Sequence, residues 1–150
     1  MNMDNAISKL PDWQKGWLAG MIDGEGFISI SSTSQTTQLP HARIGISMTC
    51  ELTIKSIYTL LEPLGATIHT RTRPDVRTIW TCTICNRMGI YDLLTALLPY
   101  FLTKAETAHI MLTYVKRRIA NVTFGKADED MVMRGHQLSI SGPKSKYKGE

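Results

Sequence analysis

Apolar residues follow two different spacings along the chain, and the spacing changes at defined points. The residues after Asp12, a favourable N-cap, lack proline until the glycines Gly24 and Gly26 interrupt the pattern, which predicts a helix over 13–22. From Phe27 onward apolar and polar residues alternate, the pattern of a half-buried strand. The chain is therefore expected to begin with a helix followed by a strand.

The same alternation of spacings then repeats. A second strand is predicted over 41–50, and the apolar stripe of an amphipathic helix covers 54–61. Two further strands over 66–73 and 77–84 follow, and another helical stripe covers 90–97. We expect the order helix, hairpin, helix, hairpin, helix, in which the helices cover the apolar face of both hairpins.

The last third of the chain adds one strong helical signal and one weak one. Thr103 to Glu106 match the capping-box pattern, and the apolar stripe that follows continues to Ile119. Asp128 is a candidate N-cap for a short further helix, and the Ser/Gly/Lys-rich residues 141–150 are expected to be a disordered basic tail. The predicted organisation is a single domain over 1–140.

The composition excludes several classes of protein. Of the 150 residues, 43% are hydrophobic, and no apolar run approaches the length of about 18 residues that spans a bilayer. The N-terminus carries no visible signal peptide, so we expect an intracellular protein, in the cytoplasm or in an organelle. Three cysteines cannot all pair and are interpreted as reduced thiols. Cys82 and Cys85 lack the second ligand pair of a structural zinc site, so burial of Cys82 in the core is expected.

The net charge of +4 is unevenly distributed. Residues 66–127 contain nine basic and three acidic residues, whereas residues 1–65 contain four basic and six acidic ones. A basic middle segment favours a polyanionic partner, although the net charge is too small to argue from alone.

The polar face of the predicted strands is rich in cations and hydroxyl groups. No Asp or Glu lies on it, which suits contact with phosphates and base edges, although an ordinary solvated sheet face has a similar composition. The residues on this face are Ser29, Ser31, Thr33, Arg43, Ser47, His69, Arg71, Arg73, Arg77, Thr81 and Thr83.

The segment that ends the first helix carries the most specific signal. Residues 18–26 read LAGMIDGEG, and this run resembles the LAGLIDADG motif of homing endonucleases, with substitutions at Met21, Gly24 and Glu25. The later elements also occur in that family's order over residues 12–120. The resemblance implies an α+β fold of the αββαββα type, in which a saddle-shaped antiparallel sheet lies over the major groove of double-stranded DNA.

Glu25 is the candidate metal ligand. A carboxylate at the negative end of a helix dipole is poorly placed unless a cation joins it, and Glu25 together with the Gly24 carbonyl offers the hard oxygen ligands that suit Mg²⁺. The resemblance implies the same role, with Mg²⁺ as the catalytic ion and Mn²⁺ or Ca²⁺ able to replace it for binding. An exposed Glu after a helix is the alternative.

Lys104 is the second candidate for catalysis. It lies in the first turn of the predicted capping-box helix, where free amide groups favour an anion such as the scissile phosphate. It also matches a lysine found at about the same place in the family. A solvated lysine at a helix start is the alternative.

The presence of one motif in the chain implies a homodimer, because the resembled family places two motifs at the centre of each enzyme. The small residues on one stripe of the first helix would then meet their copies across a two-fold axis, and packing within the monomer is the alternative. These residues are Gly16, Ala19, Gly20 and Asp23. A symmetric dimer would recognise a pseudo-palindromic site.

One position departs from the family pattern. Where well-known members place a glutamine that orders water, this sequence has Cys50, and Thr49 or Glu51 are the candidates to replace it. The function that the sequence predicts is a Mg²⁺-dependent, site-specific homing endonuclease that cleaves double-stranded DNA. The alternatives are an RNA maturase or DNA-binding regulator on the same scaffold, and an unrelated α+β interaction protein in which the motif is coincidental.

Overall fold

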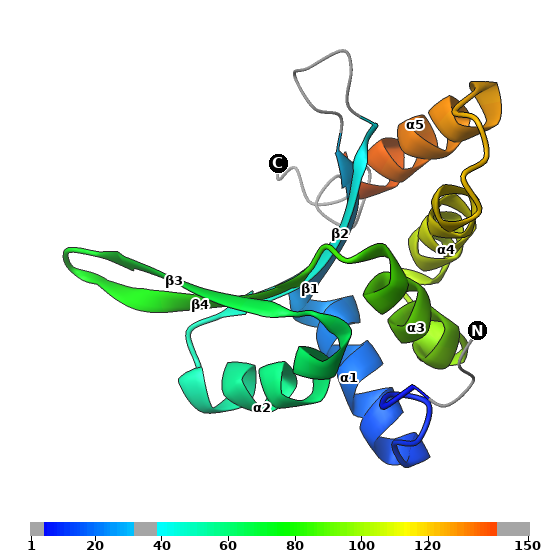
Figure 1. The fold of residues 1–150 in the computed structure, drawn as a ribbon. Coiled ribbons are helices and arrows are strands. Elements are labelled where there is room, and N and C mark those ends of the chain that lie inside the picture. Colours follow the sequence, from blue (N-terminus) through cyan, green and yellow to red (C-terminus); the bar gives the residue numbers. More distant parts are fainter. Residues whose placement is uncertain (1–4, 32–38, 141–150) are drawn as a thin grey trace, which may run out of the picture.

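The computed structural model describes residues 5–31 and 39–140, and Figure 1 shows their arrangement. Thr33 and the tail 141–150, both assigned a role from the sequence, lie outside the described residues. The elements are α1 (Asp12–Glu25), β1 (Gly26–Ser31), β2 (His41–Met48), α2 (Glu51–Leu61), η1 (Glu62–Leu64), β3 (Thr67–Arg73), β4 (Val76–Ile84), α3 (Arg87–Leu97), η2 (Leu98–Tyr100), α4 (Ala105–Ile119) and α5 (Lys126–Ile140). This order confirms the predicted α+β, αββαββα fold.

The strands form one antiparallel sheet in the order β1-β2-β4-β3. The two sequential hairpins therefore lie side by side, with the second strand of each in the middle. In Figure 1 the β3–β4 hairpin extends well beyond the helices that cover the sheet. Among the described residues, no helix is both long enough and apolar enough to cross a bilayer.

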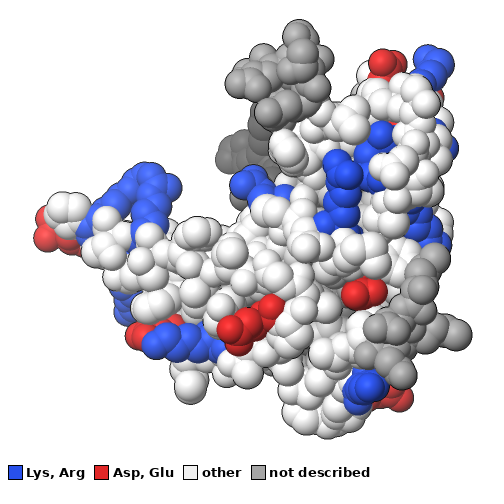
Figure 2. Space-filling view, viewed as in Figure 1, with Lys and Arg blue, Asp and Glu red and all other residues white. Residues whose placement is uncertain are grey.

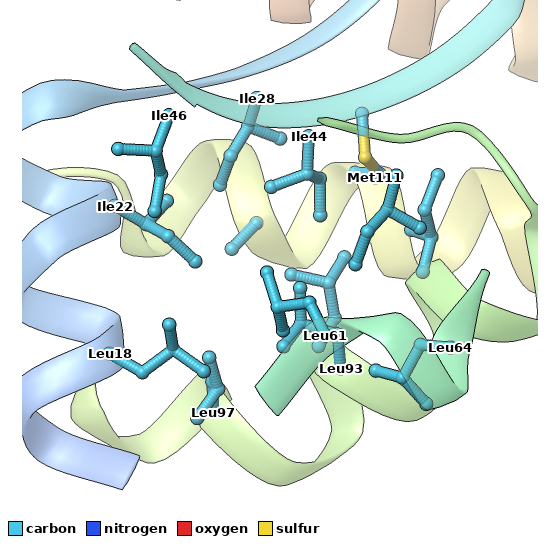
Figure 3. Close-up of a cluster of buried hydrophobic side chains, with 14 of the residues drawn as sticks. Leu18, Ile22, Ile28, Ile44, Ile46, Leu61, Leu64, Leu93, Leu97 and Met111 are labelled. Atoms are coloured by element: carbon cyan, nitrogen blue, oxygen red, sulfur yellow. The ribbon is translucent and has the colours of Figure 1, made fainter. Parts of the chain in front are cut away.

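The core lies between one face of the sheet and the helices. Alternate residues of the strands, such as Ile28, Ile44 and Ile46, point toward Leu18 and Ile22 of α1, as Figure 3 shows. Each fully buried aliphatic side chain contributes about 1.5–3 kcal/mol relative to exposure, so this face specifies the register of the whole sheet. Within residues 5–31 and 39–140, no helix covers the opposite face of the sheet.

The first helix is longer than its glycines predict. Asp12 is its first helical residue rather than its N-cap, because Pro11 occupies the cap position and the Asp12 carboxylate accepts a hydrogen bond of 2.7 Å from the Tyr100 hydroxyl. The helix also continues through Gly24 and ends at Glu25. Glu25 is consequently held by the last turn of the helix instead of following it.

The capping box predicted at 103–106 is wrong. Lys104 is the residue before the first helical residue of α4, and Glu106 forms an ion pair of 2.9 Å with Arg134 of α5 instead of closing the box. The amide groups at this helix start are bonded by a residue distant in sequence, as described below.

Helix α5 is anchored by a buried carboxylate. The predicted capping residue, Asp128, is fully buried and accepts hydrogen bonds from Arg117 at 2.8 and 2.9 Å, from Arg118 at 3.0 Å and from the Gly125 amide at 3.0 Å. The hydrogen bond from Arg117, with smaller contributions from the Gly125 amide and the two positive charges, holds the pKa of Asp128 well below its usual range. The basic end of α4 therefore fixes α5, which starts earlier than predicted, at Lys126.

Candidate nucleic-acid interface and metal-binding carboxylate

The uncovered face of the sheet carries the predicted polar residues in cross-strand rows. The hydroxyls of Ser47 and Thr81 lie 2.8 Å apart on neighbouring strands, and His69 is the partner of Thr81 on the next strand. Ser29, Ser47 and Thr81 are partly buried, whereas the long side chains are exposed at Arg43, Arg71, Arg73 and Arg77, and Ser31 and His69 are exposed as well. The structure thus brings most of the described members of the predicted face together. The exceptions are the Ser29 hydroxyl, which is buried, and Arg73, which lies beyond a register shift and pairs with Val76.

Phe27 belongs to this face, although the sequence analysis used it only as a strand start. Its ring lies across Gly45 of β2, where an added Cβ would come within 2.4 Å of the Phe27 Cζ atom. The Arg43 guanidinium lies over the same ring, 5.3 Å from its centroid, and Thr83 beside Gly45 is buried. Successive side chains of a strand point to opposite faces, and Ile28 and Ile30 point to the core. The position of Phe27 next to Ile28 therefore indicates, from the sequence alone, that its ring lies on the polar face.

One group of basic side chains lies on the β3–β4 hairpin, and others lie elsewhere on the molecule. Figure 2 shows Lys and Arg side chains gathered where this hairpin extends from the body, and the exposed arginines of that segment are Arg71, Arg73 and Arg77. The register shifts between Arg71 and Arg73, and Asp75 in the turn has a φ of 65°. The hairpin therefore carries a cationic, twisted end that is suited to following a phosphate backbone.

Glu25 lies at the junction of α1 with β1. It is exposed, and so is Gly24, whose virtual Cβ has no described atom within 4 Å. At Gly26 a Cβ would lie 2.8 Å from both Cα and O of Ile22, so glycine is required for the chain to pass directly from helix to strand. The position of the Glu25 carboxylate is thereby tied to the start of strand β1.

The donor atoms at this junction suit a divalent cation that retains most of its water. Within the described residues, no group of three or more His, Cys, Asp or Glu side chains could hold a metal by itself. One carboxylate and one main-chain carbonyl, from Glu25 and Gly24, fit Mg²⁺, which binds through few protein oxygens and completes its shell with water and phosphate.

Lys104 lies beside the same end of α1. Its Nζ donates a hydrogen bond of 2.5 Å to the main-chain oxygen of Asp23, two residues before Glu25. Burial lowers the pKa of Lys104, and the carboxylates of Asp23 and Glu25 act in the opposite direction. The two candidate catalytic residues, about 80 positions apart in sequence, are thus brought to one place.

The predicted stripe of small residues is largely occupied within the same chain. Ala19 is fully buried, Gly16 faces Tyr100, which would lie 3.7 Å from a Cβ at Gly16, and the carboxylate of Asp23 bonds to backbone amides near α4. Ala19 is therefore not available to a second copy, because its side chain already contributes to the core. Of the four residues, Gly20 is exposed, and no described atom lies within 4 Å of its virtual Cβ.

The free face of α1 is a different stripe. Trp13 and Trp17 are 71% and 37% exposed. Trp13 lies about two turns and Trp17 about one turn before Gly20, and Gly24 lies about one turn after it. Beside them is a groove between α1 and α2, lined by Trp13, Gln14, Trp17, Ser56, Thr59 and Leu60. Two aromatic side chains and two open glycines make this the surface of α1 best suited to contact another helix.

The cysteines occupy contrasting environments. Cys82 is buried, as predicted, and burial raises the pKa of its thiol to about 11. Cys50 is exposed at the N-cap position of α2, where its sulfur accepts a hydrogen bond of 3.2 Å from the Thr53 hydroxyl, and this bond lowers its pKa.

The fold and the helix-to-strand junction define the class to which the protein belongs. Residues 12–97 match the LAGLIDADG-like domain, and the chain belongs to this family. No similar sequence was found among curated proteins.

Several solved homing endonucleases are similar to this structure. The archaeal intron-encoded homing endonuclease I-Vdi141I, solved with DNA, has a TM-score of 0.70 and 16% identity over 93% of this chain and 90% of its own. I-CvuI, solved with its target and 2 mM Ca, has a TM-score of 0.66 and 18% identity over 88% of this chain and 85% of its own. A second I-CvuI structure, with uncleaved DNA and 2 mM Mg, has a TM-score of 0.59 and 19% identity over 92% of this chain and 84% of its own. The LAGLIDADG meganuclease I-AabMI, bound to uncleaved DNA, has a TM-score of 0.61 and 19% identity over 85% of this chain and 44% of its own. The fold is therefore that of LAGLIDADG homing endonucleases.

Proposed function

We propose that this protein is a homodimeric, Mg²⁺-dependent, site-specific endonuclease that cleaves double-stranded DNA. The observation that carries the proposal is the exposed Glu25 carboxylate, held at the helix-to-strand junction beside the uncovered polar face of the sheet. Relatives that share the fold were solved with DNA and with Ca or Mg, which supports the same partner and a divalent ion here.

The polar face of the sheet contacts DNA in the major groove. Hydroxyls of Ser31, Ser47 and Thr81 and the His69 ring can bond to base edges, and the arginines suit guanine or phosphate oxygens. The Ser29 hydroxyl is buried and is not part of this contact. The exposed arginines of this face are Arg43, Arg71, Arg73 and Arg77. Because two protomers present the same face, the target is a long pseudo-palindrome.

Glu25 and the Gly24 carbonyl hold the ion. When bound, Mg²⁺ supplies charge stabilisation to phosphodiester hydrolysis and lowers the pKa of water. The Lys104 ammonium, fixed beside the same helix end, is placed to bind the scissile phosphate and to stabilise the negative charge that develops there.

A second copy of the chain completes the enzyme. The free stripe of α1, made of Trp13, Trp17, Gly20 and Gly24, is the proposed contact, because the glycines permit close approach of two helix backbones. The Glu25 residues of both protomers then lie near the two-fold axis, one for each DNA strand. This face replaces the stripe predicted from the sequence, of which it retains Gly20.

Substitution of Glu25 by Gln tests the assignment. Target sites are first selected by cleavage of a randomised DNA library with Mg²⁺, with EDTA as control. Glu25→Gln removes a metal-binding charge without changing the sheet, so we expect cleavage to fall by at least about 10²-fold. The dissociation constant for the target in Ca²⁺ should change by less than about twofold.

A matched control variant is Glu62→Gln, which removes an exposed acid of η1, outside the helix-to-strand junction, and should cut normally. Cleavage by Glu25→Gln at the wild-type rate would contradict the assignment of Glu25 as the metal ligand.

A DNA-binding regulator or RNA maturase is the second candidate function, and Cys50 is the observation that favours it. A thiol bonded to Thr53 replaces the water-ordering glutamine of familiar family members. This candidate requires that the library selection recover bound but uncleaved DNA, or that the protein prefer structured RNA over duplex DNA.

A further inference from the structure

Asp23 makes three hydrogen bonds to the segment that precedes α4. Its Oδ2 accepts from the Leu102 amide at 2.8 Å, and its Oδ1 accepts from the Lys104 amide at 2.9 Å. Its main-chain oxygen accepts from the Lys104 ammonium at 2.5 Å. Both the side chain and the backbone of Asp23 are therefore engaged with one short stretch that lies about 80 residues further along the chain.

The arrangement is more specific than an ordinary helix cap. A capping side chain satisfies one or two free amides and leaves the neighbouring side chains free to rotate. Here the two carboxylate oxygens accept from the backbone amides of Leu102 and Lys104, while the carbonyl of the same Asp23 fixes the terminal amine of Lys104. The half-buried Lys104 side chain is thus constrained at both ends.

Asp23 also lies in the last turn of the helix that carries Glu25. A change in the position of Asp23 relative to the segment 102–104 would therefore change the separation of the Glu25 carboxylate and the Lys104 amine. Catalytic groups must be held to within about 0.5 Å of their productive geometry, which requires such a rigid connection between elements distant in sequence.

We infer that Asp23 is a positioning residue, which sets the Lys104 amine beside Glu25 by bonding to Lys104 at its backbone and its side chain. This inference rests on the proposed endonuclease function and adds to it the residue that places the second catalytic group. It assigns Asp23 to the interior of the protomer, in place of the dimer contact predicted from the sequence.

A double-mutant cycle tests whether Asp23 acts through Lys104. The variants are Asp23→Asn, Lys104→Met and the two combined, compared by single-turnover cleavage of the selected target with enzyme in excess. Asn keeps one acceptor oxygen but turns an NH₂ donor toward the second amide, so the segment must shift. Thermal unfolding and target binding in Ca²⁺ are measured for each variant.

We expect Asp23→Asn to lower the cleavage rate by about tenfold or more, with less than about a twofold change in target affinity. In the Lys104→Met background the same substitution should produce no further loss, because the group that it places is already absent. Multiplication of the two effects would overturn the inference, since it would mean that Asp23 acts independently of Lys104.

Asp12→Asn is the matched control. Asp12 lies on the same helix, and its carboxylate also accepts a hydrogen bond from the segment before α4, but that bond comes from the Tyr100 hydroxyl. A general loosening of α1 against this segment would affect both variants. The inference requires that Asp12→Asn retain the wild-type cleavage rate.

A second measurement does not depend on cleavage. The protein is acylated briefly with an amine-reactive ester, and modification of Lys104 is compared by mass spectrometry with that of Lys126, whose side chain is 87% exposed. Release of the Lys104 amine from the Asp23 carbonyl should raise its relative reactivity by about threefold or more in Asp23→Asn and leave it unchanged in Asp12→Asn. Unchanged reactivity in Asp23→Asn would overturn the inference.

The failures of the two proposals are distinguishable. If the wild-type protein cleaves no DNA, the proposed function fails, and the reactivity of Lys104 still decides whether Asp23 positions the amine. If Lys104→Met cleaves at the wild-type rate, Lys104 is not catalytic and the role of Asp23 in cleavage is overturned with it.

Discussion

At the scale of single residues, Gly26 and Gly45 each permit a close contact that the local sequence does not predict. Gly26 permits α1 to pass directly into β1, which ties Glu25 to the start of that strand. Gly45 leaves room for the Phe27 ring on the polar face, and the ring in turn supports the Arg43 guanidinium. An arginine held in this way loses less freedom when it contacts DNA than an unsupported one.

Gly45→Ala should disturb this support. Its Cβ would lie 2.4 Å from Phe27 Cζ and 3.1 Å from the Cys82 carbonyl oxygen, so the ring must move. We expect the free energy of unfolding, measured by urea denaturation, to fall by about 1–3 kcal/mol.

The control for Gly45→Ala is the same substitution in a Phe27→Ala background. Removal of the ring opens the space above Gly45. In that background, Gly45→Ala should therefore lower the free energy of unfolding by about 1 kcal/mol or less. An equal cost in both backgrounds would show that the ring is not the obstacle.

At the scale of elements, the attachment of α5 depends on one buried carboxylate. Asp128 has no exposed surface and is bonded to Arg117, Arg118 and the Gly125 amide. An ion pair of this kind stabilises little relative to apolar packing, but loss of one partner is costly because the remaining charges stay buried. The basic last turn of α4 suits the negative end of the helix dipole, and in the structure it is also a specific anchor for α5.

Asp128→Asn should destabilise the protein by about 3 kcal/mol at pH 7, because it leaves the buried Arg118 guanidinium without its counter-ion. The change should be accompanied by faster amide hydrogen exchange in α5. Asp130→Asn, which alters an exposed acid on the same helix, is the control and should change the unfolding free energy by less than about 0.5 kcal/mol.

The ion pairs of Asp128 with Arg117 and Arg118 also predict that the free energy of unfolding depends on pH. Since the folded state lowers the pKa of Asp128, its contribution is fully present above the unfolded-state pKa of about 3.9 and is lost as the pH falls below that value. Urea denaturation between pH 7 and pH 3 should therefore show a steeper loss of stability for the wild-type protein than for Asp128→Asn. Parallel curves would contradict this account.

At the scale of the whole molecule, two surfaces are uncovered among the described residues, and they differ in chemistry. The polar face of the sheet, with its cationic hairpin, suits DNA, whereas the stripe of α1 with Trp13 and Gly20 suits a second copy of the chain. The exposed Glu25 lies where these surfaces adjoin, at the end of α1 and the start of β1. The proposed dimer therefore brings the carboxylates and the DNA-binding faces of both protomers together.

Gly20→Leu tests this assembly. Because no described atom lies within 4 Å of its Cβ position, the protomer should fold normally, while two symmetry-related leucines should keep the helices apart. A clash of about 1–3 kcal/mol at each copy weakens dimerisation by about 30-fold or more, which sedimentation velocity measures.

Thr113→Leu, at an exposed position of α4, adds the same side chain away from α1 and should leave the sedimentation profile unchanged. The proposed interface would have to be abandoned if Gly20→Leu sedimented as the wild-type dimer, or if the wild-type protein were monomeric.

Local patterns predicted the elements and the sheet faces well. Ile28 and Ile30 alternate with serines because one face of β1 packs on the helices, so periodicity alone separates core from surface. The capping box failed because Thr103 and Glu106 satisfy a local rule, whereas Asp23 provides a better acceptor from a distant element. Helix caps are sensitive to any acceptor that tertiary packing brings within hydrogen-bond distance.

The sequence by itself determined the succession of helices and strands, the polar face and the motif that ends in Glu25, because these depend on spacing between near neighbours. Only the tertiary structure decided which stripe of α1 is free, since the segment 98–104 packs against Gly16 and Asp23 and leaves Trp13, Trp17, Gly20 and Gly24 uncovered. It likewise placed Lys104 beside Glu25. These outcomes depend on contacts between elements about 80 residues apart, which residue spacing along the chain does not encode.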